Sequence, residues 1–277
     1  MKTLLLPLFL LVCFSASAQY YYKDIVGTKE TAGTITAYKN NGVKRVLVNS
    51  YDAENTRVED LYVEQQFAAD AQLLKTITRS ASAPPSVLLA YTDAAGRVVK
   101  TVDSTENMVS TTTYSYDGEG RLTSLTSNSS DTAKKLNETE QHIWKYQDGQ
   151  VHSMLRIINN IDTTFVTFKL DEKGNVVEEQ STRRGVKAQP VFYYYDVSNR
   201  LTDVVRYNNK ARRLLPEYMF EYSPENRIIQ RITVPANSSD YLIWRYQYDA
   251  NGLKIREAIY NKNKELNGKI EYQYQRS

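Results

Sequence analysis

A short string of turn-forming residues recurs along this chain at a nearly constant interval. It stands as Tyr-Asp-Gly-Glu-Gly-Arg-Leu at 116–122 and as Tyr-Asp-Val-Ser-Asn-Arg-Leu at 195–201. The Gly or Asn that marks successive copies lies at positions 149, 174, 199, 226 and 252, about 25 residues apart. That length suits two strands and two turns. The repeat predicts an all-β fold of tandem antiparallel β-hairpins, a meander sheet that twists or curls on itself.

Each copy has the residue types that close a tight hairpin. The third residue after the leading Asp is Gly or Asn, because that backbone position takes a positive φ that bulky residues avoid. The Asp side chain can accept a hydrogen bond from the backbone two residues further on. We therefore interpret the following residues as structural turns: Asp93, Gly96, Asp117, Gly120, Asp171, Gly174, Asp196, Asn199, Asn226, Asp249 and Gly252.

The residues before the tips alternate between two faces, as in a half-buried strand. Tyr193 and Tyr195 share one face, for example, and Tyr194 points to the other. The aromatic face is either the core or an exposed surface that stacks on sugar rings, and we favour the core. For an exposed ligand-binding site the candidates are Tyr194, Trp144 and Trp244, of which the two tryptophans occupy equivalent repeat positions.

The first 18 residues have the layout of a cleaved secretory signal. Lys2 precedes an apolar run from Leu4 to Phe14, and small residues end at Ala18. We expect cleavage near Ala18 and a secreted, periplasmic or cell-surface location. The single cysteine, Cys13, would be lost with the signal, so no disulfide is expected. No later segment has the roughly 20 apolar residues of a transmembrane helix.

We divide the rest of the chain into a less regular segment at 19–84 and a repeat domain at 85–277. Residues 28–41 favour a short helix that closes on the pair Asn41-Gly42. We expect a hairpin to follow this helix. Strand is the competing assignment, because threonines such as Thr31 are poor helix formers. The Ser- and Pro-containing stretch at 80–86 is the expected linker.

The composition gives no indication of catalysis or nucleic-acid binding. Lys and Arg number 35 against 32 Asp and Glu, without the basic bias of a nucleic-acid binder. His142 and His152 are the only histidines and have no partner cysteine, which is too few ligands for zinc. No nucleophile motif such as Gly-x-Ser-x-Gly occurs. We expect no catalytic residues, no metal and no cofactor.

The string at 116–122 and its Asn-bearing copy at 195–201 resemble the YD repeat of the RHS family. The resemblance extends over roughly Ser86 to Ser277. It implies a long β-ribbon that curls into a shell around a toxin cargo. We expect neither a shell-closing core segment nor a cargo domain, so that only the hairpin architecture carries over, in a short, cargo-less protein.

Three functions remain open at this stage. The first is a non-enzymatic surface or periplasmic module that binds a glycan or another envelope protein, or acts structurally. The second is a glycan-directed hydrolase of the cell envelope, since paired carboxylates can meet in space. The third is an outer-membrane β-barrel, which the number of alternating strands would permit. We favour the first.

Overall fold

The computed structural model describes residues 20–70, 72–235, 238 and 240–276, so the expected signal segment lies outside the described residues. Their secondary structure is one helix and 19 strands. The helix is α1 (Lys23–Asn40), and the strands are β1 (Val43–Tyr51), β2 (Leu61–Ala68), β3 (Leu73–Ser80), β4 (Ala83–Thr92), β5 (Val98–Ser104), β6 (Met108–Tyr116), β7 (Leu122–Asp131), β8 (Leu136–Gln147), β9 (Gln150–Ile158), β10 (Asp162–Leu170), β11 (Val176–Arg183), β12 (Val186–Lys187), β13 (Val191–Tyr195), β14 (Leu201–Asn208), β15 (Arg213–Tyr222), β16 (Ile228–Thr233), β17 (Leu242–Tyr248), β18 (Lys254–Tyr260) and β19 (Leu266–Arg276).

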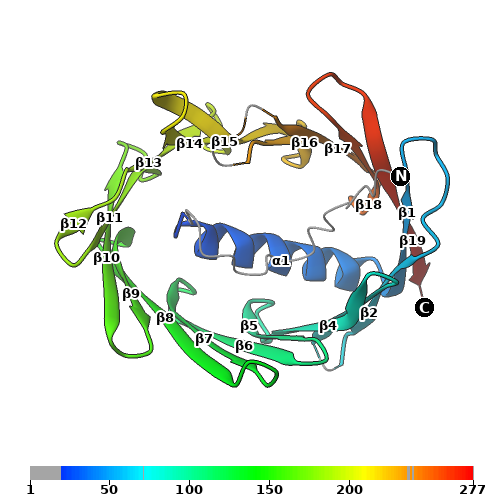
Figure 1. Cartoon of the computed structure of the whole chain (residues 1–277), viewed down its shortest axis with the longest axis horizontal. Coiled ribbons are helices and arrows are strands. Elements are labelled where there is room, and N and C mark those ends of the chain that lie inside the picture. Colours follow the sequence, from blue (N-terminus) through cyan, green and yellow to red (C-terminus); the bar gives the residue numbers. More distant parts are fainter. Residues whose placement is uncertain (1–19, 71, 236–237, 239, 277) are drawn as a thin grey trace.

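The strands form one closed ring (Figure 1). Neighbouring strands pair antiparallel in chain order, and β1 pairs with both β2 and β19. The short β12 and the longer β13 pair with different parts of β11, so together they fill one position of the ring. The result is an antiparallel β-barrel with 18 strand positions. The predicted all-β hairpin series with one N-terminal helix is confirmed, and its sheet is closed rather than open.

The barrel wall continues across the boundary expected at residue 84. Strands β1, β2 and β3 belong to the same sheet as the repeats, and the expected linker at 80–86 runs into β4. Thr78 pairs with Ser86 and Ser80 with Ala83, with a register shift between the two pairs. The two prolines therefore lie at an interruption of the ladder, where the missing N–H of proline is tolerated.

The N-terminal helix is longer than predicted, because it begins at Lys23 rather than at Thr28. The Thr28 hydroxyl does not cap a helix start, since it donates to the Asp24 carbonyl at 2.8 Å inside α1. The end agrees with the prediction: Gly42 has φ 62° and its N–H donates to the Lys39 carbonyl. Within the described ranges, no helix is long and apolar enough to span a membrane.

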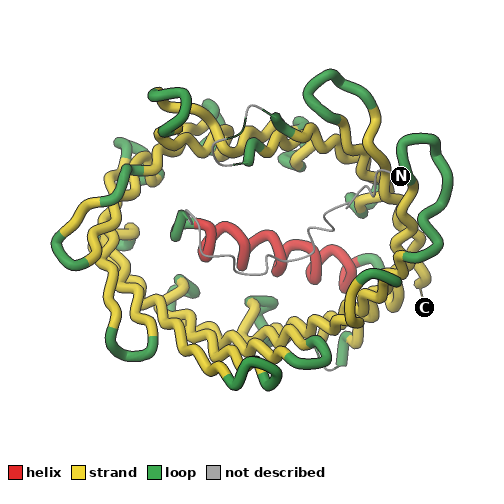
Figure 2. Tube along the Cα trace, in the orientation of Figure 1, coloured by secondary structure: helices red, strands yellow, loops and turns green. Residues whose placement is uncertain are grey.

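The helix crosses the interior of the ring (Figure 2), and apolar side chains of the wall pack against it. Ile25, near the start of α1, packs with the buried Trp144 and Met154. Ile35, near its end, belongs to a second cluster with Val63 of β2. Because these contacts come from strands far apart in the sequence, tertiary packing stabilises a helix whose own propensity is low.

The outer side of the wall is mostly polar, although it also exposes apolar side chains such as Phe165 of β10. On β10, Val166 and Phe168 pack in the inner cluster, whereas Thr167 and Lys169 point outward and are exposed. Other exposed charges on outward positions of the strands are Lys100, Lys145, Glu221 and Arg245. An outer-membrane barrel has the reverse arrangement, with an apolar band about 25 Å tall on its outside. This barrel has its large apolar clusters inside and rows of exposed charges on its outside.

Candidate binding site at the hairpin tips

The tips of the repeat gather at one end of the barrel. Successive strands run in opposite directions, so the turns that follow β4, β6, β8, β10, β13, β15 and β17 all lie at the same end. We call this set of turns the tip ring. A similar turn at Asp52, between β1 and β2, lies at the opposite end, because it follows a strand that runs the other way.

The tip at Asp117 illustrates the turn. The Gly120 N–H donates to the Asp117 carbonyl and the Asp117 N–H to the Arg121 carbonyl, both at 3.0 Å. The Asp117 carboxylate accepts the N–H groups of Glu119 and Arg121. The Arg121 N–H is the main cause of the lowered pKa of Asp117. Gly120 has φ 79°, which explains the Gly or Asn at this position. Equivalent backbone bonds occur at Asp93, Asp171, Asp196, Ser223 and Asp249.

The arginine that follows the Asp117 tip connects this tip to the next tip along the ring. The Arg121 Nε lies 2.7 Å from the Asp117 carboxylate, and its guanidinium lies 4.8 Å from the centre of the Tyr146 ring. A cation over an aromatic ring is attracted by the negative face of that ring. The same stacking joins Arg97 to Tyr116, Arg200 to Tyr222 and Arg227 to Tyr248. This contact was not predicted from the sequence, although the arginine is part of the repeated string at 116–122 and 195–201.

The tyrosine before five of the tips bonds to the hairpin before it. Pairing between β7 and β8 stops at Ser124 and Ile143, and beyond that point the Tyr146 hydroxyl donates to the Leu122 carbonyl at 2.9 Å. Burial raises the pKa of Tyr146 to about 12, so the hydroxyl keeps its proton. The same bond is made by Tyr116, Tyr195, Tyr222, Tyr248 and Tyr274. These hydroxyls replace ladder bonds where neighbouring hairpins separate.

The tip at Asp171 lacks the arginine, as do the tips at Asp148 and Asp249, where Gln150 and Leu253 follow the glycine. Asn175 stands in its place after the tip at Asp171, and its amide donates to the Asp171 carboxylate at 2.9 Å. Among the described residues, no Lys or Arg lies over the ring of Tyr195, the next tyrosine along the ring. A cleft of about 350 Å³ lies here. We call it the Asn175 cleft, and it is lined by Asp171, Glu172, Lys173, Asn175, Val177, Tyr193, Tyr194, Tyr195, Asp196 and Asn199.

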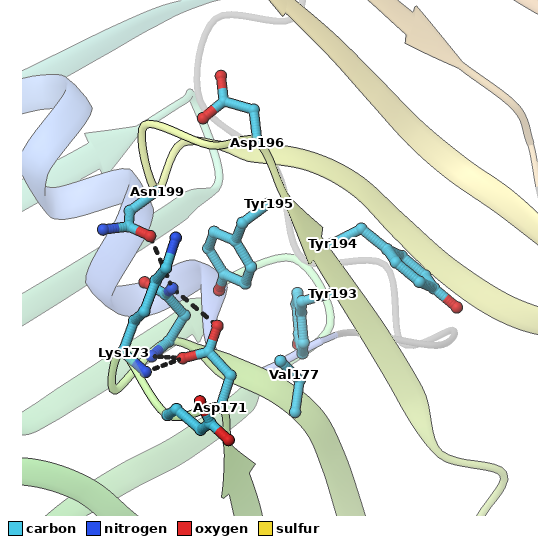
Figure 3. Close-up of a pocket in the computed structure, with 10 residues that line it drawn as sticks. Asp171, Lys173, Val177, Tyr193, Tyr194, Tyr195, Asp196 and Asn199 are labelled. Atoms are coloured by element: carbon cyan, nitrogen blue, oxygen red, sulfur yellow. Dashed lines mark hydrogen bonds between the residues drawn. The ribbon is translucent and has the colours of Figure 1, made fainter.

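Figure 3 shows how these side chains lie. The Tyr195 ring points toward the tip that carries Asp171, and the Tyr194 ring points away from that tip. Tyr194 is 51% exposed, as expected for a residue on the outer face. Trp144 and Trp244 are only 3% exposed and lie in the interior, where Trp144 stacks on Phe168. The structure therefore does not bring the three candidate ligand-binding aromatics together, and Tyr194 alone borders a cleft.

The interior contains a charged network that links the helix to the wall. His142 of β8 is buried, with Nδ1 2.6 Å from the Asp24 carboxylate and Nε2 2.8 Å from Glu140. Burial alone would lower the pKa of His142, but the two carboxylates raise it to about 9. Burial likewise opposes ionisation of Glu140, yet His142 and Arg156 lower its pKa to about 2. Two acceptors on one ring favour a doubly protonated imidazolium.

A second buried carboxylate fixes the chain just before α1. Glu179 of β11 accepts the N–H groups of Tyr21 and Tyr22 at 2.9 to 3.0 Å and the Tyr193 hydroxyl at 2.8 Å. Burial raises the pKa of Glu179, and these three donors oppose that rise. Because its partners come from two distant parts of the chain, Glu179 joins the N-terminal segment to the barrel wall.

The described residues contain no cluster of three or more His, Cys, Asp or Glu side chains able to hold a metal ion. A further cavity of about 440 Å³ lies between α1 and the tips, and its lining includes Lys29, Tyr116, Arg121 and Tyr146. Most of these groups already take part in the contacts of the tip ring. The Asn175 cleft is therefore the better candidate for an external partner.

Comparison with known proteins agrees with the repeat. Residues 88–132 match the model of the RHS repeat. No curated protein matches the chain. Similar solved structures include a porin-like protein from Bacteroides uniformis, with a TM-score of 0.34, 9% identity and coverage of 84% of this chain and 98% of that one. A porin-like protein from Bacteroides vulgatus has a TM-score of 0.27, 11% identity and coverage of 84% and 98%. The TcdB2-TccC3-Cdc42 structure has a TM-score of 0.31 and 10% identity, and the match spans 84% of this chain and 17% of that chain.

Proposed function

We propose that this chain is an exported, non-enzymatic binding module, in which a water-facing β-barrel holds the tip ring and presents the Asn175 cleft to a partner. The observation that carries the proposal is the polarity of the wall. Outward positions bear exposed charges such as Lys145 and Arg245, and inward positions pack on α1. Charges on a lipid-facing surface are costly, so this arrangement favours water on the outside.

The outer-membrane alternative shares the closed architecture and differs in what the wall faces. Partition of the purified mature protein separates the two. We expect a monodisperse species in detergent-free buffer that does not float with lipid vesicles and raises no ion conductance in planar bilayers. Heat-modifiable migration of protein taken from the membrane fraction, together with conductance, would overturn the water-facing barrel.

A glycan or another envelope protein is the partner class that we propose for this module. The site is tested on a glycan array and with envelope extracts, using Tyr194→Ala at the cleft and Tyr207→Ala on the outer face of β14 as the control. Saturable binding that is lost only in Tyr194→Ala would support the site. Turnover of a glycan would favour the hydrolase. An equal loss of binding in both variants would show that the binding site does not lie at the cleft.

A further inference from the structure

The repeat itself indicates what is missing from the Asn175 cleft. At four junctions of the tip ring a guanidinium lies between the Asp of its own tip, or the equivalent Ser223, and the tyrosine of the next. At the tip of Asp249 the corresponding residue is Leu253, which is 1% exposed and fills its position within the core. Asn175 is too short to cover the Tyr195 ring, and its amide turns instead to Asp171 and Asn199.

Asp171 also differs from its counterparts in charge pairing. Asp93, Asp117 and Asp196 each have an arginine nitrogen 2.7 Å from the carboxylate. Across the described part of the chain, no cation lies within ion-pair distance of Asp171, whose partners are the backbone N–H groups of the turn and the amide of Asn175. The Asn175 amide is the main cause of the lowered pKa of Asp171. Asp171 is thus an ionised acid that, among the described residues, has no cation in ion-pair contact, although Lys173 lies in the same cleft.

The remaining lining adds to this negative character. Glu172 also lines the cleft, against the single ammonium of Lys173, whereas the charge of Asp196 is paired with Arg200. An uncovered aromatic face beside a carboxylate is a site for a planar cation, which can stack on the ring and bond to the acid at the same time. The repeat provides the internal precedent, since Arg200 does both with Asp196 and Tyr222.

We propose that the Asn175 cleft binds the guanidinium of an arginine side chain carried by a partner protein. The incoming group would lie over Tyr195 and bond to Asp171, in the position that the chain's own arginine occupies at four other junctions. This inference rests on the proposed function, since it names the partner chemistry of the same site. A neutral glycan is the competing occupant.

The test is an NMR titration of the ¹⁵N-labelled mature protein with N-acetyl-L-arginine amide. We expect saturable shifts confined to the amides of 171–175 and 193–199. N-acetyl-citrulline amide, which has the same shape without the charge, should bind about tenfold or more weakly. Asn175→Arg should abolish the shifts, because the introduced side chain fills the cleft, whereas Asn175→Ala should retain them.

Asp171→Asn is expected to weaken arginine binding to the level of the citrulline probe, with folding checked by the amide spectrum. Equal binding of both probes, or undiminished binding to Asn175→Arg, would contradict the proposal. A glycan that shifts the same amides when the arginine probe does not would remove arginine as the ligand and leave the proposed function standing. Insertion of this protein into lipid vesicles would instead contradict the proposed function.

Discussion

The inner and outer faces of the barrel are made from alternate residues of the same strands, yet they are stabilised differently. On β8 the inner residues are His142, buried between two carboxylates, and Trp144, which is 3% exposed. Their neighbour Lys145 points outward and is exposed. On β11, Glu179 faces inward with three donors and Glu178 faces outward toward the exposed Lys169. The inner face therefore provides the contacts that hold α1, whereas the outer face carries exposed charges that make few packing contacts.

The largest difference between the faces is expected from neighbouring residues of β8. Trp144→Ala removes a ring that packs on Phe168 and the cluster around Ile25, and should lower the free energy of unfolding by about 3–5 kcal/mol. Lys145→Ala should change it by less than about 0.5 kcal/mol. Guanidinium denaturation in detergent-free buffer measures both. Similar losses would show that the wall is not asymmetric.

The next effect is a pH dependence that belongs to the inner histidine. The pKa of His142 is about 9 in the folded protein against about 6.5 in the unfolded chain. The contribution of His142 to the free energy of unfolding, about 3 kcal/mol, is therefore fully present below pH 6.5. It is lost as the pH rises through 9. His142→Gln should remove this slope in urea titrations between pH 6 and 9.5.

His152→Gln is the control for this experiment, because His152 lies exposed on β9. We expect it to retain the slope of the parent protein. If His142→Gln and the parent lose stability equally over that interval, the contacts of His142 with Asp24 and Glu140 do not hold a protonated ring.

The smallest effect compares an inward with an outward tyrosine. Tyr222→Phe removes the hydroxyl that donates to the Leu201 carbonyl at 2.8 Å and should cost about 1 kcal/mol. The ring itself remains under Arg200. Tyr194→Phe should be neutral to within about 0.5 kcal/mol, since its ring is exposed. Equal values from thermal unfolding would mean that the hydroxyl bonds between hairpins do not stabilise the tip ring.

The local parts of this structure could be predicted from the sequence, and the long-range parts could not. Period-two alternation and the Gly or Asn markers predict the strands, the turns and the inward aromatic face. Closure depends on β1 pairing with β19, which joins residues such as Val43 and Arg276 at opposite ends of the chain. No local pattern reports such a pairing. The start of α1 at Lys23 could likewise not be predicted, because contacts with the barrel interior stabilise the first turns of the helix.

The candidate site could be predicted only in part from the sequence. Tyr194 was singled out correctly as an outward residue, whereas Trp144 and Trp244 are core. His142 looked like an isolated histidine, because its partner Asp24 is 118 residues away. Asn175 did carry a signal: the residue after the tip is Arg in four copies, and Asn175 departs from it. Aligning the copies position by position would have revealed the cleft.

The central claim, that apolar clusters of the inner face are buried and the outer face meets water, is tested most directly with cysteines at Val166 and Thr167 of β10. Both are introduced singly after Cys13→Ser, because the chain has no other cysteine. Val166 is 0% exposed and Thr167 is exposed. We predict that Thr167→Cys reacts rapidly with a charged maleimide, with or without lipid vesicles, and that Val166→Cys reacts only on unfolding. Reaction of Val166→Cys in the folded protein, with lipid protecting Thr167→Cys, would contradict the account.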